Sequence, residues 1–264
     1  MKSRGWRIAR YELRDVARGR WLLVYVALLF GLAQTLLALE ADVTRALAGL
    51  INVVLIVVPL VGLLFGTLHL YGAKDFNRML LAQPVGRKEL FNGLYAGVAL
   101  PLAGATILGL GFPLGIATAA SPEALVGVIR FLAISAALTL ASVSLAFLTS
   151  VTVRDRAAGM GVAVLIWLSL TVLYDGILVA VASSLPGVAL ERPALVLTLL
   201  NPIDTARVLL LMQFDGAALM GYTGAVFRNF FGGAVGVTVA FATLVTWAVV
   251  PLLLARRVFR RADL

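Results

Sequence analysis

The sequence has 264 residues, of which 61% are hydrophobic and 13% are charged, and its mean hydropathy is +1.01. Soluble domains do not have this composition, so we predict an integral membrane protein. The formal net charge is +9, but the basic residues lie in short clusters between apolar runs, which argues against a nucleic-acid-binding protein. The absence of Cys excludes disulfides, thiolate metal sites and Cys nucleophiles.

Residues 1–20 precede the first apolar run and have an amphipathic pattern. Trp6, Ala9, Leu13 and Val16 recur at helical spacing, with arginines on the remaining surface. This pattern predicts a cytoplasmic amphipathic helix lying at the membrane interface. A basic flank that only orients the first span is the alternative interpretation.

Six apolar runs are long enough to cross a bilayer as helices of ~1.5 Å rise per residue. The first run is too long for the core of a signal peptide, so we expect a retained signal anchor. The runs lack the alternating polar pattern of barrel strands. We therefore predict an all-α integral membrane protein with one transmembrane domain, residues 1–264, whose spans are 21–39, 46–71, 91–119, 124–150, 159–185 and 234–255.

The Lys and Arg residues are distributed unevenly between the two sides of these spans. Of the 22, 17 lie in segments 1–20, 72–90, 151–158 and 256–264. Cytoplasmic segments of membrane proteins carry an excess of Lys and Arg, so we expect these segments, and both termini, to be cytoplasmic.

The connection 72–90 contains a short helical pattern. Phe76, Met79 and Leu80 share one helical face, Asp75 can cap its start, and Pro84 ends it. We predict a short cytoplasmic helix, which either docks a partner or only fills a long interfacial connection.

The outer segment 186–233 is apolar, but neither half of it is long enough to cross the membrane. We predict two or three short helices that dip into or lie on the outer leaflet. Asn201-Pro202-Ile203-Asp204 has the residues of a helix start: an Asn cap, Pro at the first helical position, and Asp accepting from free amides of the first turn. A structural cap is the simpler role for this tetrapeptide, and a ligand contact is the alternative.

Two charged residues fall inside predicted spans, Arg130 in the fourth and Asp175 in the fifth. A charge at such depth costs a few kcal/mol or more unless it has a partner. Because the two spans run in opposite directions, both residues lie at a similar height. We predict that they pair or share a water-filled vestibule. A proton or cation relay is the rival hypothesis, but a relay usually needs a chain of such groups.

Enzyme motifs are missing from the sequence. There is no Gly-x4-Gly-Lys-Ser/Thr phosphate loop, no zinc-binding H-E-x-x-H, and no G-x-S-x-G to accompany His69. We therefore predict that the chain is not an enzyme and has no catalytic residue, metal site or cofactor of its own.

One motif carries a family resemblance. Leu80-Leu81-Ala82-Gln83-Pro84-Val85-Gly86-Arg87 resembles the "LLxxPvxR" signature of ABC type-2 transporter permeases of the NosY type. These permeases are the membrane subunits of the ABC complex that supports copper-site maturation of nitrous oxide reductase. Segments 8–13, 20–23 and 200–207 are similar as well, so the resemblance covers most of the chain. The sequence departs from the family pattern at Gly72 to Met79, where many members of the wider family have a G-E-x-x-x-G-T-L stretch with paired acids.

The resemblance implies a half-transporter in the bacterial inner membrane that dimerises with a second copy. A separate cytoplasmic ATPase dimer would bind ATP and Mg²⁺ and dock on loop 72–90. The outer segment would contact a periplasmic β-helix protein that interacts with a copper chaperone and the reductase. The residues expected at the ATPase contact are Asp75, Phe76, Arg78, Met79, Leu80 and Arg87, and those expected at the periplasmic contact are Asn201, Pro202, Asp204 and Arg207.

The composition also bears on the substrate. With no Cys and one His, the chain has no ladder of copper ligands through the membrane, so a mechanical role is favoured over copper conduction. A lipid or polysaccharide exporter of the same fold is one alternative, and it would form a continuous cavity at the dimer interface. A secondary transporter would need paired broken helices, which the sequence lacks. A non-transporting membrane anchor would not bring an ATPase with it on purification.

Overall fold

The computed structural model describes residues 19–40, 42–73, 86–119, 121–177, 191–212 and 233–261, together with Arg10, Leu13, Arg14, Val16 and Ala180. Six of its helices are long and apolar enough to cross a membrane, which confirms the predicted all-α membrane fold. The predicted N-terminal amphipathic helix falls mostly outside the described residues. The assignment of the whole chain to a single domain stays a prediction.

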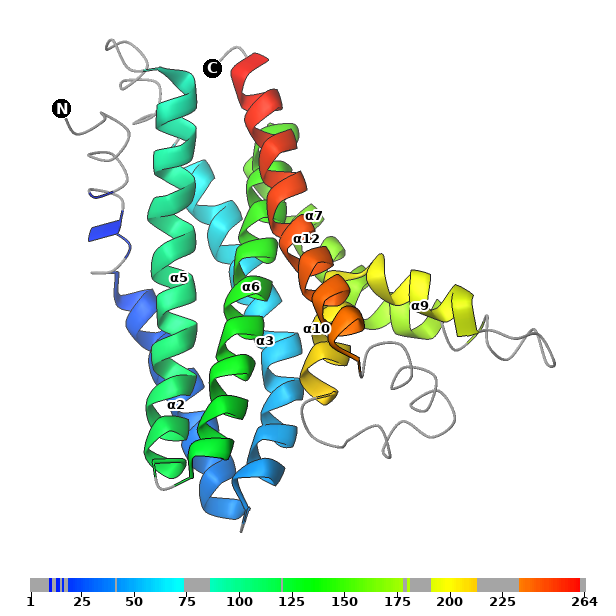
Figure 1. The fold of residues 1–264 in the computed structure, drawn as a ribbon. Helices are drawn as coiled ribbons and strands as arrows, with labels where there is room; N and C mark the ends of the chain where they lie inside the picture. Colours follow the sequence, from blue (N-terminus) through cyan, green and yellow to red (C-terminus); the bar gives the residue numbers. More distant parts are fainter. Residues whose placement is uncertain are drawn as a thin grey trace.

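The first four spans are continuous helices whose bounds lie within a few residues of those predicted (Figure 1). A π-helical turn, η1, interrupts the fifth span, which is described as far as Ile177. The sixth span continues past the predicted end at 255, because its arginines extend the helix beyond the apolar stretch. The bounds are α2 (Arg20–Leu39), α3 (Val43–Gly72), α5 (Arg87–Ala117), α6 (Pro122–Thr152), α7 (Arg156–Leu168), η1 (Ser169–Leu173) and α12 (Ala234–Arg261).

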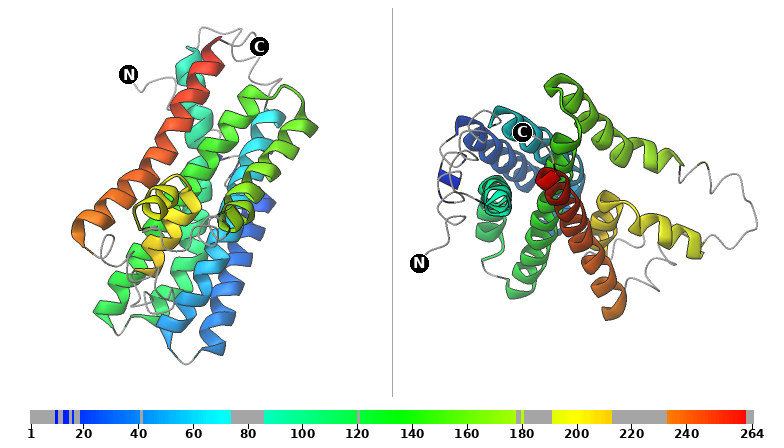
Figure 2. Two further views of the ribbon diagram at one scale, coloured as in Figure 1. Left: turned by 90° about the vertical axis from the view of Figure 1, so that its right-hand side faces the viewer. Right: turned by 90° about the horizontal axis from the view of Figure 1, so that it is seen from above.

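Two short helices lie between the fifth and sixth spans, α9 (Glu191–Leu199) and α10 (Pro202–Leu211). They agree with the predicted short helices of the outer segment; residues 213–232 are outside the described part of the chain. Seen along the bundle, α7 and α9 lie at one edge of it, while α10 sits against α6 and α12 (Figure 2).

Helix α6 forms the centre of the bundle and packs against α3, α5 and α12. It contributes Phe131 and Phe147 to the largest fully buried side chains, and the ring of Phe147 makes an edge contact with Phe91 of α5 at 5.8 Å. The outward surfaces of the spans are apolar and exposed, as at Leu108 and Phe112 of α5. Apolar surface of this extent suits a bilayer rather than water.

The spacing Gly62-x-x-x-Gly66 predicts a close approach of helices, and the structure shows one between α3 and α6. A Cβ atom added at Gly66 would lie 2.8 Å from the Cβ of Ala146, and one added at Gly62 would lie 2.8 Å from the Cβ of Ser142. Real Cβ atoms do not approach so closely, so only glycine allows this contact.

Candidate functional site

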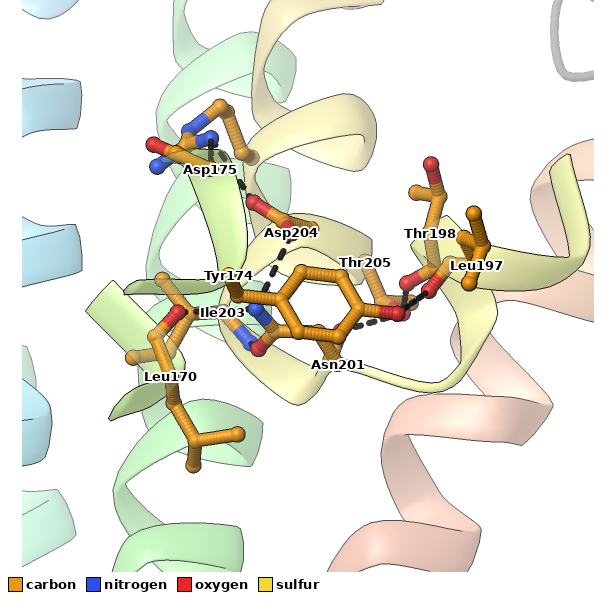
Figure 3. Close-up of polar contacts among 10 residues, drawn as sticks. Leu170, Tyr174, Asp175, Leu197, Thr198, Asn201, Ile203, Asp204 and Thr205 are labelled. Carbon is orange, nitrogen blue, oxygen red and sulfur yellow. Dashed lines mark hydrogen bonds and ion pairs between the residues drawn. The ribbon is translucent and has the colours of Figure 1, made fainter. Parts of the chain in front are cut away.

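A cluster of polar side chains joins the fifth span to α10 (Figure 3). Arg207 donates one hydrogen bond to Asp175 at 2.8 Å and another to Asp204 at 2.7 Å. Asp204 also accepts from the side-chain amide of Asn201 at 2.9 Å. Two carboxylates therefore share one guanidinium, and the three groups together carry one net negative charge when all are ionised.

The start of α10 positions this cluster. Asn201 caps the helix by accepting from the amide of Ile203 at 2.9 Å, and Pro202 occupies the first turn, so the predicted helix start is confirmed. The prediction for Asp204 was only partly right. Its carboxylate lies in the first turn as expected, but the hydrogen bonds that it accepts come from the side chains of Asn201 and Arg207 rather than from backbone amides.

The amide of Asn201 also fastens α10 to the π-helical turn of the fifth span. It donates to the carbonyl of Leu170 at 2.8 Å. Widened π turns disturb the regular hydrogen bonding of a helix and are often found at functional sites. Tyr174, the residue after η1, donates its hydroxyl to the carbonyl of Leu197, so the fifth span is bonded to α9 as well. The turn between α9 and α10 is held from the other side by Trp247 of α12, which donates to the carbonyl of Leu199 at 3.3 Å.

Burial sets the ionisation of the cluster. The side chain of Asp204 is 5% exposed, and burial raises its pKa from the ordinary 3.8 to about 6. Arg207 acts in the opposite direction, while the charge of Asp175 raises the pKa further. Burial acts to lower the pKa of Arg207, but its hydrogen bond to Asp175 and the two carboxylate charges outweigh burial, so this pKa is raised. The guanidinium therefore stays charged.

The opposite end of the bundle carries a second candidate site, which we call the basic end. Here α5 begins at Arg87, and Arg87 donates to the carbonyl of Arg260 in the last turn of α12 at 3.1 Å. The end of α3 reaches the same region, since Tyr71 donates to the carbonyl of Val153, between α6 and α7, at 2.7 Å. The ends of α3, α5, α6, α7 and α12 thus meet on one side.

The family is decided by comparison with known proteins. Residues 6–264 match the ABC-2 family of transporter proteins. The chain belongs to the ABC-2 transporter family. It is 30% identical over 273 residues to the probable ABC transporter permease protein NosY of Pseudomonas aeruginosa, covering 97% of this chain and 98% of that protein. The protein of the same name from Stutzerimonas stutzeri is 29% identical with equal coverage. The chain is therefore a NosY-like, multi-pass permease subunit, and the ATPase of such a transporter is a separate subunit.

Most of the predicted ATPase-contact residues of this permease cannot be placed. Asp75, Phe76, Arg78, Met79 and Leu80 lie outside the described residues, so these assignments stay predictions. Arg87 is described and lies at the basic end.

The predicted pair of Arg130 and Asp175 is not what the structure shows. Within the described part of the chain, the guanidinium bonded to Asp175 is that of Arg207, whereas Arg130 lines a groove beside α10 and α12. The positions of Arg130 and Asp175 along two antiparallel spans predict similar depths in the membrane. They do not predict which way each side chain points around its helix. The spacing of Asp204 and Arg207, three residues apart on one predicted helix, indicates that these two residues pair, but it does not indicate that Asp175 joins them.

The burial of the residues predicted to contact a periplasmic partner limits that role. Asn201, Pro202 and Asp204 are buried and make contacts within the permease itself. They are thus not available on the surface to a periplasmic partner, and the structural role that we considered the simpler one fits them better. Arg207 is partly exposed, with 27% of its side chain accessible.

Proposed function

We propose that this permease works as a homodimer that couples ATP hydrolysis on a cytoplasmic ATPase dimer to movement on the outer side of the bacterial inner membrane. We further propose that this movement serves copper-site maturation of nitrous oxide reductase. ATP and Mg²⁺ bind to the ATPase in this scheme. The observation that carries the proposal is the extent of similarity, because the NosY permeases match the chain over 97% of its length.

The basic end supports a cytoplasmic orientation for the docking loop. Arg154, Arg156 and the four arginines near the end of α12 lie near the helix ends on this side, as the excess of basic residues in cytoplasmic segments requires. Loop 72–90 leaves α3 and enters α5 here. In this proposal the loop presents Phe76, Met79 and Leu80 to the ATPase, and the bond from Arg87 to Arg260 braces α5 against α12.

The fifth span offers surface for a second copy of the chain. In α7 the buried residues are the small ones Gly159 and Ala163, whereas Leu165 on this helix and Val172 in η1 are exposed. We propose that part of this apolar surface is covered in the homodimer.

On the outer side, we propose that a periplasmic β-helix protein, which interacts with a copper chaperone, contacts the surface around α9. Val196 and Leu200 are exposed there, and the bonded charged pair Arg207 and Asp175 nearby has accessible surface. Asn201 and Asp204 hold α10 in place for this contact. Conduction of copper is disfavoured because successive soft ligands are needed along such a path, and the chain has no Cys and one His.

A pair of substitutions in the docking loop tests the coupling. Phe76→Asp places a charge on the apolar face of the predicted helix, whereas Asn77→Asp adds the same charge about 100° away from it. We expect Phe76→Asp to lose the ATPase on purification of the complex and to yield reductase without copper, and Asn77→Asp to retain both. Full ATPase recovery with Phe76→Asp would overturn the docking assignment.

A deletion strain separates the coupling from the maturation role. Cells without the permease should produce copper-deficient nitrous oxide reductase, measured by metal content and the visible absorption of the enzyme. Normal copper content in these cells, together with a defect in surface lipid or polysaccharide, would instead identify an exporter.

A further inference from the structure

A groove of about 670 Å³ opens between α6, α10 and α12. This size is typical of pockets that hold a small organic molecule. Its wall is largely apolar and includes Ile134 of α6, Leu209 and Met212 of α10, and Val237 and Phe241 of α12. Small residues keep it open where the helices approach, and they include Ala133, Gly233 and Ala242.

Arg130 is the basic residue on this wall. It is exposed, and no carboxylate among the described residues is bonded to it. Because it is the ninth residue of α6, its Cα lies about 12 Å from the start of that helix. The 31-residue helix is about 46 Å long and a hydrocarbon core is about 30 Å thick, so a centred helix extends about 8 Å beyond the core at each end.

The Cα of Arg130 therefore lies about 4 Å inside the hydrocarbon boundary. Side chains of a helix lean toward its N-terminus, which for α6 is the nearer membrane surface. The guanidinium therefore reaches toward the level of the lipid phosphates, while Ile134, one turn further along α6, lies deeper. A charged group at the top of an apolar groove, at this depth, is complementary to one class of molecule.

We propose that this groove binds a phospholipid, with its phosphate on Arg130 and an acyl chain along Ile134, Leu209 and Phe241. A guanidinium forms charge-assisted, often bidentate, hydrogen bonds to phosphate. The bound lipid fills the space between α10 and the two spans beside it, and so supports the helix that carries the outer polar cluster. The site is independent of the copper-maturation role proposed above.

The test is native mass spectrometry of the intact transporter complex with phosphatidylglycerol. Arg130→Gln should lower lipid occupancy roughly ten-fold, the effect of one charge-assisted hydrogen bond. Ala133→Phe, which fills the groove and keeps the arginine, should lower occupancy as well. Arg45→Gln, an equivalent change at an exposed arginine of α3 that does not line the groove, should leave occupancy unchanged.

Two comparison ligands separate the phosphate from the acyl chain. Diacylglycerol, which lacks the phosphate, should bind weakly and equally to the unaltered protein and to Arg130→Gln. Glycerol 3-phosphate should not displace the lipid, because it lacks the chain. Arg130→Lys keeps a cation and should retain most binding, which guards against a folding defect in the glutamine variant. Equal occupancy in Arg130→Gln and Arg45→Gln, no effect of Ala133→Phe, or displacement by glycerol 3-phosphate would each overturn the proposal.

Discussion

Replacement of Arg207 by methionine should destabilise the permease, and the loss should depend on Asp204. Methionine keeps much of the side-chain length but removes the guanidinium from between Asp175 and Asp204. The side chain of Asp175 is 41% exposed, so its ion pair contributes about 0–1 kcal/mol. The side chain of Asp204 is 5% exposed, and the loss of a buried partner costs about 3–5 kcal/mol. Most of the expected loss therefore comes from the buried carboxylate.

Protonation limits this loss. Burial already raises the pKa of Asp204 to about 6, and Arg207 acts to lower it. Without Arg207 the pKa rises further, so the carboxyl binds a proton near neutral pH and is no longer a buried charge. We therefore expect Arg207→Met to lower the free energy of unfolding by about 3 kcal/mol at pH 8, the lower limit of that range, and by less at pH 5.5.

Chemical unfolding in mixed micelles, followed by tryptophan fluorescence, measures these losses. Trp247 is a suitable local probe because it bonds to the turn that precedes α10. In a double-mutant cycle, Arg207→Met combined with Asp204→Asn should cost about 1–3 kcal/mol less than the sum of the single changes. Asp175→Asn is the control and should cost at most about 1 kcal/mol. Additive losses, or a loss from Arg207→Met as small as that of the control, would refute the reasoning.

Three further outcomes follow from the structure. Gly66→Ala should lower stability by about 1–3 kcal/mol, whereas Gly104→Ala, which has nothing within 4 Å, should not; unfolding of the two variants under the same conditions decides this. Asn201→Ala loses the helix cap and the donors to Leu170 and Asp204, so it should cost about 1–3 kcal/mol, and Asn201→Asp should cost more because it places a second buried carboxylate beside Asp204; the same unfolding assay ranks the two variants. Because folding raises the pKa of Asp204, the folded state binds the proton more tightly than the unfolded state does. The free energy of unfolding should therefore fall by about 3 kcal/mol as the pH rises from about 4 to 6, and stay level above pH 6. In a pH series of unfolding curves, the Asp204→Asn variant should lack this fall.

The spans could be predicted from the sequence because the bilayer imposes one requirement on each of them. A run of about twenty apolar residues with satisfied backbone groups has to be a helix, whatever it packs against. The start of α10 could also be predicted from the sequence, since the helix-starting roles of Asn201 and Pro202 involve only the adjacent backbone. The helix start depends on neighbouring residues in the sequence, and the spans depend on the bilayer around them.

The partner of Asp175 could not be obtained in this way. Counting residues along two antiparallel spans gives the height of Arg130 and Asp175 but not the rotation of either helix. In the structure Arg130 faces the groove beside α12, and Asp175 faces Arg207. The π-helical turn of η1 adds to the difficulty, because it changes the direction of every following side chain and leaves no sequence motif.

The interfaces of α10 with the packed helices and with the fifth span differ in kind, and this difference indicates which of them can open. This helix packs more extensively on α12, α6 and α3 than on η1, and residues such as Ile203 and Leu209 are buried in that packing. Its link to the fifth span is chiefly polar. Asn201 donates to the carbonyl of Leu170 in η1, and Arg207 donates to Asp175, which follows η1 in the same span. A few directional bonds can exchange partners or water, while close packing resists separation.

Motion transmitted from the basic end should therefore separate η1 from α10 and leave α10 moving with α12. Coupling between the two ends requires an element with two arrangements, and the π-helical turn with its polar contacts fits that requirement better than the packed helices. Spin labels at the exposed residues Val172, Leu200 and Val239 allow a direct comparison. ATP binding should change the distance from Val172 to Leu200 and leave the distance from Leu200 to Val239 constant. A change confined to the second distance would place the moving boundary between α10 and α12 instead.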